Sequence, residues 1–450
     1  MEAKACRTTR AINKSKGIKF MAFDEIAAII QSRDSEKLKE VIREGRIDDI
    51  NMVGGNNYTS LLMIACRGGF IECAKVLLDH NANINYQTKK ASVLKSACMS
   101  GNVDMLRFLI ERNIKITDRI TLTCFDSASI LGNTEITAIL IEYINDVNWE
   151  EGRGSFLHKA CNPGYIAIVL MLLERGALLT VGDWDALVAA ALNSHLEVVN
   201  VLLEWNAATE RISPDSVKKA LKLASRAGYI DIVQALIEYG TNVGALTSAL
   251  SKAIEGNRVE VASYLLDHGA DFNAVPRNQY SSPWIYACTL GRPAMVRLFL
   301  DRGADVNAVD DKGWSPLKAA LSHPKVLELL LEHKANPNLP LPDHRKESGS
   351  ALLEVVGCSY KDYTQALNIL LKYGADTNLA HTATGDTPLM RAARYASLNI
   401  VRLLLEHGAD VNQENNEGKS VLDLLGQSPK CIEVRKLCTE YIDLGKPVLK

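Results

Sequence analysis

Short helical patterns of apolar residues, arranged in pairs, fill most of this chain. Within residues 385–412, Leu389, Ala392 and Ala393 are spaced as one narrow face of a short helix. A second apolar set follows at residues 400–405 and is spaced as a wider helical face. This segment is therefore predicted to form two short helices, one directly after the other.

The same pair of patterns recurs along the chain with a period near 33 residues. Successive copies lie 29 to 37 residues apart when they are aligned on the position of Thr387. Units of this length, each too short to bury a core alone, are typical of a stacked solenoid. The aligned positions are Thr59, Ala91, Leu122, Ser155, Asp185, Lys219, Ser248, Ser282, Ser315, Ser350, Thr387 and Ser420.

The copies divide the chain into one array with degenerate ends and one irregular joint. Residues 22–53 are expected to form an N-terminal capping repeat, and residues 419–450 a C-terminal capping repeat and tail. Repeats 1–9 cover residues 54–338, and repeats 10 and 11 cover residues 350–418. Residues 339–349, with the sequence LPLPDHRKESG, are expected to form an irregular linker or finger. We expect the array to open at this joint before it opens elsewhere.

Small residues recur at three fixed positions of the copies, and each position has a physical role. Between the two helices a residue of positive φ is expected, which favours glycine or asparagine. The residues found there are Gly69, Gly101, Gly132, Gly164, Gly228, Asn257 and Gly291. A second such position follows the second helix, at Gly176, Gly240, Gly269, Gly303, Gly374 and Gly408. In the first helix a small residue lets neighbouring pairs approach closely. It is Ala65, Ala97, Ala128, Ala160, Ala190, Ala224, Ala253, Ala287, Ala320 or Ala392.

These repeats resemble those of the ankyrin family. The family signature T-P-L-H-x-A is matched by TPLMRA at 387–392, SPLKAA at 315–320 and SFLHKA at 155–160. Its LLxxGADVN ending is matched by FLDRGADVN at 299–307 and LLEHGADVN at 404–412. The resemblance implies an all-α fold, an ankyrin-repeat α-solenoid of paired antiparallel helices with hairpin-like fingers. It also implies that fingers and first helices together line a concave binding surface.

Two copies depart from the pattern at their turns. The third copy ends in IEYINDVN, at 141–148, and has no glycine after its second helix. The ninth copy carries His323 and Pro324 where the glycine between the helices is expected. These departures mark places where the stacking is expected to be irregular.

Composition and charge argue against several classes of function. The chain has 51 basic and 53 acidic residues and a formal net charge of −2, so nucleic acid is not favoured as a partner. Its ten cysteines form no CxxC pair, which fits a reducing cytoplasmic or nuclear setting. The longest apolar run, residues 166–173, is too short for a membrane helix, so no membrane insertion is expected. Residues 1–21 are expected to form a basic flexible tail.

The resemblance to the ankyrin family implies that partners contact the fingertips, particularly the residue before the aligned position. Tyr58, Trp184 and Trp314 occupy that slot in our alignment and are our preferred partner-binding residues. Tyrosine and tryptophan bury much area at interfaces with little loss of conformational freedom. The alternative is that each ring packs on its neighbouring finger.

Basic residues on the first helices form a second candidate set. Their side chains are expected to face the groove, where they could anchor an acidic peptide. The set is Arg67, Lys159, Lys318, Arg391 and Arg394. The alternative is a solvated helix face, because charges on short surface helices are common.

Cysteines and histidines occupy repeat positions that favour packing roles over chemistry. Cys66, Cys98, Cys161 and Cys288 share the small buried slot of Ala393. Four histidines, His80, His268, His333 and His407, share the end of the second helix, where the helix dipole favours them. No nucleotide-binding, zinc-protease or hydrolase motif occurs in a usable context. No catalytic residue, cofactor or metal is therefore expected.

A protein-protein interaction scaffold or adaptor is the function that these observations favour. The partner is expected to be another protein or an extended peptide, and the sequence leaves its identity and the oligomeric state open. The alternative is a regulatory or substrate-recruiting arm of a larger assembly, such as a ubiquitin ligase, channel or kinase. Residues 434–442 are loosely similar to a helix that engages ubiquitin-ligase adaptors, but a plain closing helix is the favoured interpretation, because the rest of that motif is missing.

Overall fold

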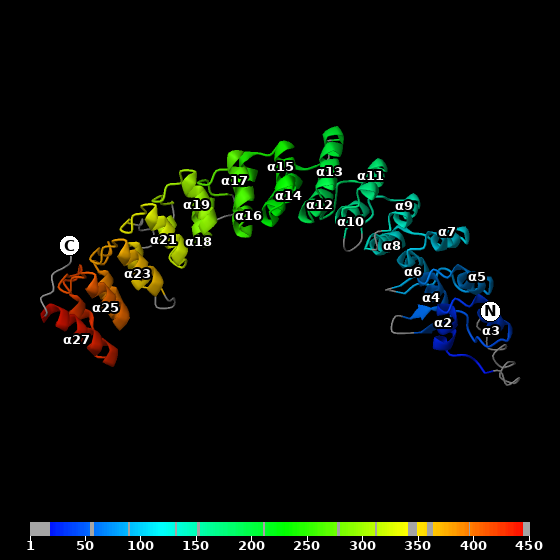
Figure 1. The fold of residues 1–450 in the computed structure, drawn as a ribbon, viewed down its shortest axis with the longest axis horizontal. Coiled ribbons are helices and arrows are strands. Elements are labelled where there is room, and N and C mark those ends of the chain that lie inside the picture. The colour runs from blue at the N-terminus through cyan, green and yellow to red at the C-terminus, as the bar shows by residue number, and fades with distance from the viewer. Residues whose placement is uncertain are drawn as a thin grey trace. The chain divides into compact units, whose positions relative to one another are not determined.

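The structure is a computed structural model. It describes residues 19–443 apart from 55–57, 89–90, 131–132, 151–153, 210–211, 277–279, 311–312, 341–348, 358–362 and 396. The chain forms two compact units, divided between Ala220 and Leu221. Each unit contains two rows of short helices, an inner row of first helices and an outer row of second helices (Figure 1).

Unit 1 shows the predicted helix pairs in sequence. Its inner row is α2 (Phe23–Gln31), α4 (Leu61–Arg67), α6 (Val93–Ser100), α8 (Asp118–Ile130), α10 (Phe156–Cys161) and α12 (Ala186–Leu192). Its outer row is α3 (Ser35–Arg43), α5 (Ile71–Asp79), α7 (Val103–Glu111), α9 (Thr134–Glu142), α11 (Ile166–Glu174) and α13 (Leu196–Thr209). Each inner helix packs on the next inner helix, as α4 does on α6 and α6 on α8. The predicted all-α solenoid of paired helices is confirmed.

Unit 2 continues the same arrangement, and the division itself falls inside α14. The inner row is α14 (Pro214–Ala227), α16 (Val243–Gly256), α18 (Pro283–Thr289), α20 (Pro316–Ala319), α22 (Ala351–Val356), α24 (Pro388–Arg394) and α26 (Val421–Leu424). The outer row is α15 (Ile230–Glu238), α17 (Val259–Asp267), α19 (Pro293–Asp301), α21 (Pro324–Glu332), α23 (Thr364–Lys372), α25 (Leu398–Glu406) and α27 (Pro429–Asp443). Helix α27 packs against α25 and buries Val434 and Cys438.

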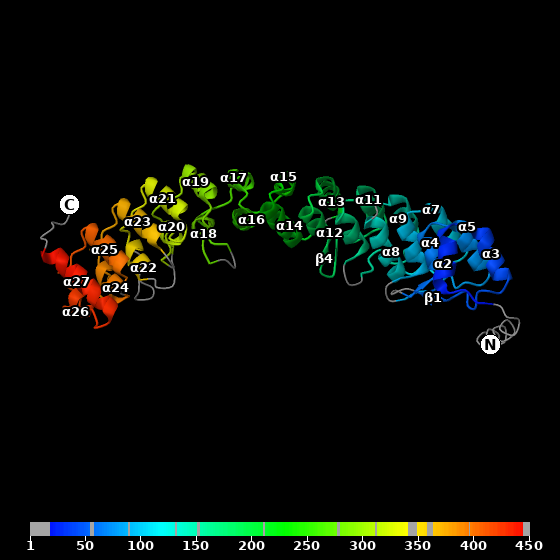
Figure 2. The same cartoon turned by 60° about the horizontal axis from the view of Figure 1, so that its bottom comes forward.

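Extended fingers connect successive helix pairs, and two of them contain short antiparallel strands. Strand β1 (Val53–Gly54) pairs with β2 (Thr59–Ser60), and β3 (Thr180–Val181) pairs with β4 (Trp184–Asp185). These strands lie beside the inner row and not beside the outer row (Figure 2). In both hairpins the last residue of the second strand precedes an inner helix directly, so the finger fixes where that helix begins.

Helix N-caps define the register of the repeats. The hydroxyls of Ser60, Ser92 and Thr387 each accept a hydrogen bond from the amide three residues on, at 3.1–3.2 Å. The structural equivalents of Thr387 are therefore Ser60 and Ser92, and our alignment on Thr59 and Ala91 is wrong by one residue. The physical reason is that a cap needs a side-chain oxygen on the residue just before the helix: Thr59 lies one residue too early, and Ala91 has no such oxygen.

Both predicted turn positions are confirmed wherever the structure describes them. The glycines between the helices have φ between 61° and 93°, and Asn257 has φ 56°. The glycines after the second helices have φ between 81° and 115°. Gly132 lies outside the described residues. Three copies without a final glycine place Asn81, Asn113 or Lys334 in the same left-handed conformation. The third copy has no residue of positive φ at 141–148, so its turn differs, as predicted.

The small first-helix residues lie at the centre of the core, as predicted. All ten alanines of that set are 0% exposed. A larger side chain at this position would push adjacent helix pairs apart, because protein interiors are packed to the density of organic crystals. Short helices can therefore stack closely only where the sequence repeats a small residue.

The ninth copy differs from our interpretation of its turn. Pro324 begins α21 as Pro293 begins α19, but it follows Ser315 by only nine positions, whereas Pro293 follows Ser282 by eleven. His323 therefore occupies the N-cap position of the outer helix and not the glycine position. Its Nε2 lies 2.8 Å from the carbonyl oxygen of Thr289 in the preceding repeat. The turn is two residues shorter, and α20 is correspondingly short.

Asparagines after the outer helices connect consecutive repeats on both sides of the predicted weak joint. Asn338 accepts a hydrogen bond from the amide of Asp376 at 2.7 Å and donates one to the carbonyl of Gly374 at 3.2 Å. Asn378 makes the same two bonds one repeat later, at 2.7 and 3.1 Å. Residues 341–348 and the basic tail before residue 19 lie outside the described residues. The weak joint and the division into capping and internal repeats therefore stay predictions.

Candidate partner-binding surface

Trp184 contacts the inner row of the preceding repeat. Its ring centroid lies 4.9 Å from that of His158, which is on α10, and Trp184 is half-buried by this contact. Burial lowers the pKa of His158 and the nearby Lys159 lowers it further, while Asp185 opposes both effects. A neutral imidazole is therefore favoured beneath the indole at neutral pH. Part of the indole remains available to a partner.

Trp314 and Lys318 form a connected pair in unit 2. Trp314 is 42% exposed, and the Lys318 ammonium lies 5.6 Å from its ring centroid. The same ammonium pairs with the Glu354 carboxylate of the next repeat at 2.7 Å. The exposed Trp314 indole is thus held by the Lys318 ammonium, and an ion pair with the next repeat fixes that ammonium in turn. Sequence spacing suggested each residue separately but not their contact.

Tyr58 occupies a different position in its finger from the two tryptophans. Strand pairing makes Thr59 the equivalent of Trp184, which places Tyr58 one residue nearer the fingertip. Its φ of 50° turns the backbone there, and the side chain is 66% exposed. Tyr58 therefore remains a candidate contact. It was proposed because it was aligned with Trp184, however, and the structure places Thr59 at that repeat position.

Arg391 and Arg394 lie together on α24, but Arg394 also has an internal role. Its guanidinium pairs at 3.0 Å with Asp386, whose side chain is only 3% exposed. The other Asp386 oxygen accepts a hydrogen bond from the Asn415 amide group at 2.8 Å. Arg391 packs toward Gly357 of the preceding repeat. Asp386 is therefore a buried carboxylate that joins two neighbouring fingers. Sequence reasoning did not single it out.

Replacing Asp386 with alanine is expected to lower the free energy of unfolding by about 2 kcal/mol, because Arg394 and the buried Asn415 both lose their partner. Urea denaturation followed by circular dichroism measures this change. Glu417→Ala is the control and should leave it nearly unchanged, since Glu417 and its ion-pair partner Lys419 are each at least half exposed. Equal effects of the two variants would contradict the role of Asp386 in joining two fingers.

A charged network connects α14, α16 and α18 on the inner row of unit 2. The Glu255 carboxylate lies 2.6 Å from the Lys252 ammonium and 3.8 Å from the Arg226 guanidinium. It also accepts a hydrogen bond from the Tyr286 hydroxyl at 3.4 Å. Burial raises the pKa of Tyr286, and Glu255 raises it further. These charges are largely satisfied within the chain, so we do not assign them to a partner.

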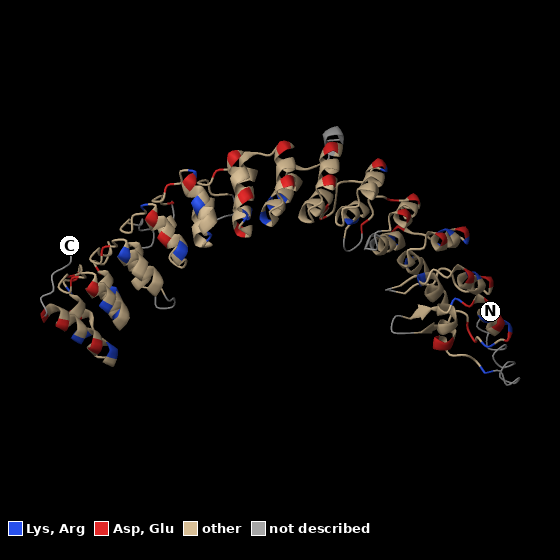
Figure 3. Cartoon of the chain, in the orientation of Figure 1, with Lys and Arg blue, Asp and Glu red and all other residues tan. Residues whose placement is uncertain are grey.

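Carboxylates mark the C-terminal ends of the outer helices (Figure 3). Negative charge at that end of a helix is opposed by the helix dipole. Asp79 and Asp267 are each offset by an arginine of the next repeat, Arg112 and Arg302, at 3.1 Å. The other carboxylates at outer-helix ends include Glu111, Glu142, Glu174, Glu238, Asp301, Glu332 and Glu406. The two ion pairs at these helix ends therefore help to hold successive repeats together.

The cysteines and histidines take the packing positions that the repeat pattern indicates. Burial raises the pKa of Cys66, Cys161 and Cys288, which keeps these thiols protonated and poorly nucleophilic. The four helix-end histidines each place Nδ1 2.8–2.9 Å from the carbonyl oxygen one turn earlier. Among the described residues no group of histidine, cysteine and carboxylate side chains has the arrangement of a metal site.

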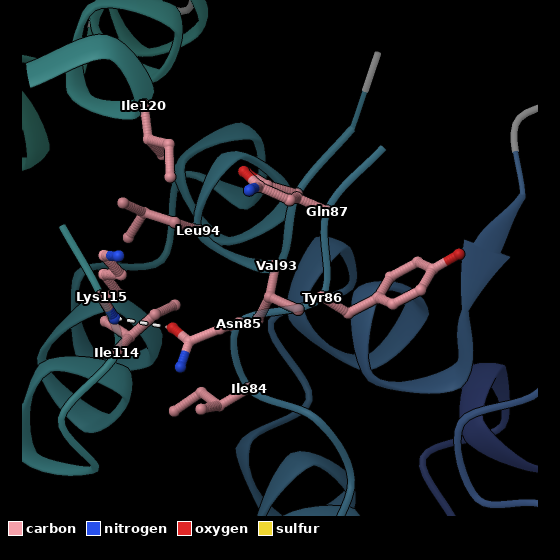
Figure 4. A pocket seen from close by; sticks show the side chains of 10 residues that line it. Ile84, Asn85, Tyr86, Gln87, Val93, Leu94, Ile114, Lys115 and Ile120 are labelled. Atoms are coloured by element: carbon pink, nitrogen blue, oxygen red, sulfur yellow. Dashed lines mark hydrogen bonds between the residues drawn. The ribbon is translucent and has the colours of Figure 1, made fainter. Parts of the chain in front are cut away.

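Two hollows flank α6 in unit 1, and sequence analysis predicted neither. The first, of about 60 Å³, is lined mainly by apolar residues, including Ile84, Val93 and Ile114, with the amide of Lys115 bonded to Asn85 at its edge (Figure 4). The second, of about 340 Å³, is lined by polar and basic residues of three successive repeats. Both depend on how neighbouring repeats stack, which explains why local patterns gave no signal.

No helix in the described part of the chain is long and apolar enough to cross a membrane. The fold and surface define a helical repeat protein without an evident catalytic centre in its described residues. The family model for ankyrin repeats, in three copies, matches residues 26–120, 187–276, 250–340 and 355–444. The chain belongs to the ankyrin repeat family.

Curated relatives share the repeats, and the matched region spans a third or less of each relative named here. The chain is 32% identical over 311 residues to ankyrin repeat and KH domain-containing protein mask-1 of Caenorhabditis elegans, covering 67% of this chain and 10% of that protein. It is 34% identical over 152 residues to the B-cell lymphoma 3 protein homolog of Mus musculus, covering 33% of each. It is 24% identical to the E3 ubiquitin-protein ligase KEG of Arabidopsis thaliana, covering 73% of this chain and 22% of that protein.

Among solved structures, the ankyrin repeat domain of Bcl-3 is similar, with a TM-score of 0.39 and 21% identity. The match covers 56% of this chain and 97% of that one.

Proposed function

We propose that this chain is a protein-protein interaction scaffold or adaptor that binds its partner through fingers and inner helices. Ankyrin repeats are a protein-protein interaction module, and the chain consists largely of them. The observation that carries the proposal is the pair of Trp314 and Lys318, in which an exposed indole is held in place by a fixed cation. A preorganised aromatic side chain loses little conformational freedom on binding, as interface hot spots require.

The proposed contacts form one set in each unit. In unit 1 they are Tyr58 and Trp184, and in unit 2 they are Trp314 and Lys318, extended onto α24 by Arg391 and Arg394. Both Arg394 and Lys318 keep exposed surface while they are paired within the chain. A partner that contacts them does not have to break their internal ion pairs.

Affinity capture with the full chain, read by mass spectrometry, tests this proposal. A partner recovered with the wild-type chain is expected to be lost, or reduced about tenfold, with Trp314→Ala or Trp184→Ala. Trp149→Ala is the matched control, because Trp149 is similarly exposed but lies outside the proposed set. Undiminished recovery with Tyr58, Trp184 and Trp314 all changed to alanine would show that the proposed contacts are wrong.

A second candidate function is a regulatory or substrate-recruiting arm of a larger assembly. It is favoured by the small share of its longer relatives that the chain matches, such as 22% of a ubiquitin ligase and 34% of a human cation channel. Helix α27 offers a surface for such contacts, since Ile432 and Ile442 are exposed on it. Recovery of ubiquitin-ligase adaptors that disappears with Ile432→Glu or Ile442→Glu would support this candidate over a simple scaffold.

A further inference from the structure

The larger hollow of unit 1 lies on the inner row, between the N-terminal repeats. It has a volume of about 340 Å³. Thr59 and Arg67 come from the repeat that contains α4, Lys95, Ser96 and Met99 from α6, and Ser127 from α8. Three successive repeats thus contribute to one concavity, on the row that also carries the proposed partner contacts.

The lining of this hollow is rich in hydrogen-bond donors. Arg67 and Lys95 supply two cations, and Thr59, Ser96 and Ser127 supply three hydroxyl groups. No carboxylate residue is among its described lining residues. Such a set of donors suits an anion, because hydrogen bonds to a charged acceptor are about twice as strong as neutral ones.

Arg67 is the cation with the greatest freedom to bind a ligand. It is exposed at the end of α4, and it forms no ion pair with any other described residue. Lys95, in contrast, already has an interaction within the chain. Arginine presents several N–H groups in a fixed plane, which matches the oxygens of a phosphoryl or carboxylate group.

Two of the three hydroxyl groups in the hollow are also available to donate a hydrogen bond to a bound anion. The hydroxyls of Thr59 and Ser96 make no hydrogen bond within the described part of the chain, whereas that of Ser127 donates to the carbonyl of Thr123 at 3.1 Å. A phosphoryl group has three acceptor oxygens and can use more of these donors than a carboxylate can. Met99, which is partly exposed at the edge, adds an apolar surface beside them.

We propose that this hollow binds an anionic side chain, phosphoryl or carboxylate, of the partner polypeptide. Arg67 is the principal cation, the Thr59 and Ser96 hydroxyls donate to the anion, and Met99 contacts an apolar neighbour of the anionic residue. This inference rests on the proposed function, because it names the chemistry that one part of the same binding surface recognises.

Fluorescence anisotropy with three labelled peptides tests the proposal on the full chain. The peptides share the sequence Gly-Leu-X-Leu-Gly, and X is phosphoserine, aspartate or serine. We expect the phosphoserine and aspartate peptides to bind more tightly than the serine peptide. Tighter binding of phosphoserine would identify a phosphoryl group as the preferred anion, and tighter binding of aspartate a carboxylate. Arg67→Ala should weaken the anionic peptides about tenfold.

Arg107→Ala is the matched control, because Arg107 lies on the outer helix α7 and pairs with Glu135. It should leave the affinity of the anionic peptides unchanged, and circular dichroism should show both variants folded. The proposal is overturned if the anionic peptides fail to bind at about 1 mM, or if Arg67→Ala and Arg107→Ala act equally. Partner capture that still depends on Trp184 and Trp314 would then leave the proposed function standing without this hollow.

Discussion

Replacing Trp284 with alanine will lower the free energy of unfolding of unit 2 by about 4 kcal/mol. Trp284 is 1% exposed and is among the largest fully buried side chains of the described residues. Its ring packs edge-on against Phe299 at 5.9 Å, and its Nε1 donates to the carbonyl of Asp305 at 3.0 Å. Alanine removes both contacts and leaves a cavity between α18 and its neighbours. Urea denaturation followed by circular dichroism measures the loss.

Two further variants identify the cause of the Trp284 effect. Trp284→Phe keeps an aromatic ring but removes the Nε1 donor, so the Asp305 carbonyl accepts only from the Ala308 amide, and the effect should be about half as large. Trp314→Ala is the matched control, because Trp314 is 42% exposed in the same unit and should change stability by less than about 1 kcal/mol. If Trp284→Ala were as mild as Trp314→Ala, Trp284 would not be a central part of the core.

Replacing Gly256 with alanine is expected to destabilise unit 2 by about 3 kcal/mol. In most helices this substitution stabilises by about 1 kcal/mol, because glycine is the more flexible residue. Here a methyl group on Gly256 would lie 2.0 Å from the backbone carbonyl oxygen of Arg226. That carbonyl belongs to α14, so α14 and α16 would have to separate.

Gly244→Ala is the matched control for Gly256, because it lies on the same helix. A methyl group there would meet its nearest atom, an Asn242 oxygen, at 3.5 Å, which is an ordinary contact. This variant should leave stability unchanged or raise it by up to about 1 kcal/mol. Opposite signs for the two substitutions, measured by thermal and urea unfolding, are the expected result. A stabilising Gly256→Ala would show that the two helices are not in close contact there.

Much of the fold could be predicted because ankyrin repeats are specified by local patterns. The spacing of Leu389, Ala392 and Ala393 indicates a short helix whatever surrounds it. A glycine such as Gly164 or Gly176 fixes a left-handed turn through its own backbone freedom. Errors arose where the pattern shifted by a residue or two, at Thr59 and Ala91 and again at His323, because spacing alone does not show which residue caps a helix.

The candidate surface was predicted less well because its contacts depend on how each finger packs on its inner helix and on the next repeat. Sequence reasoning proposed Trp314 and Lys318 independently, and it gave no reason to pair Lys318 with Glu354. It treated Arg394 as a partner contact without the buried Asp386 that holds it. It named Arg67 as a groove-facing cation but gave no sign of the hollow, since the residues that line it come from three repeats.

The sequence by itself determined the helix pairs, their turns and the small residues that allow them to stack, because these depend on interactions within a few positions. Only the tertiary structure decided which side chains meet across a repeat boundary, as Gly256 meets Arg226 and Trp184 meets His158. The physical reason is that the offset between successive helix pairs sets those distances. A shift of 1 or 2 Å, about the length of one bond, makes or breaks such a contact.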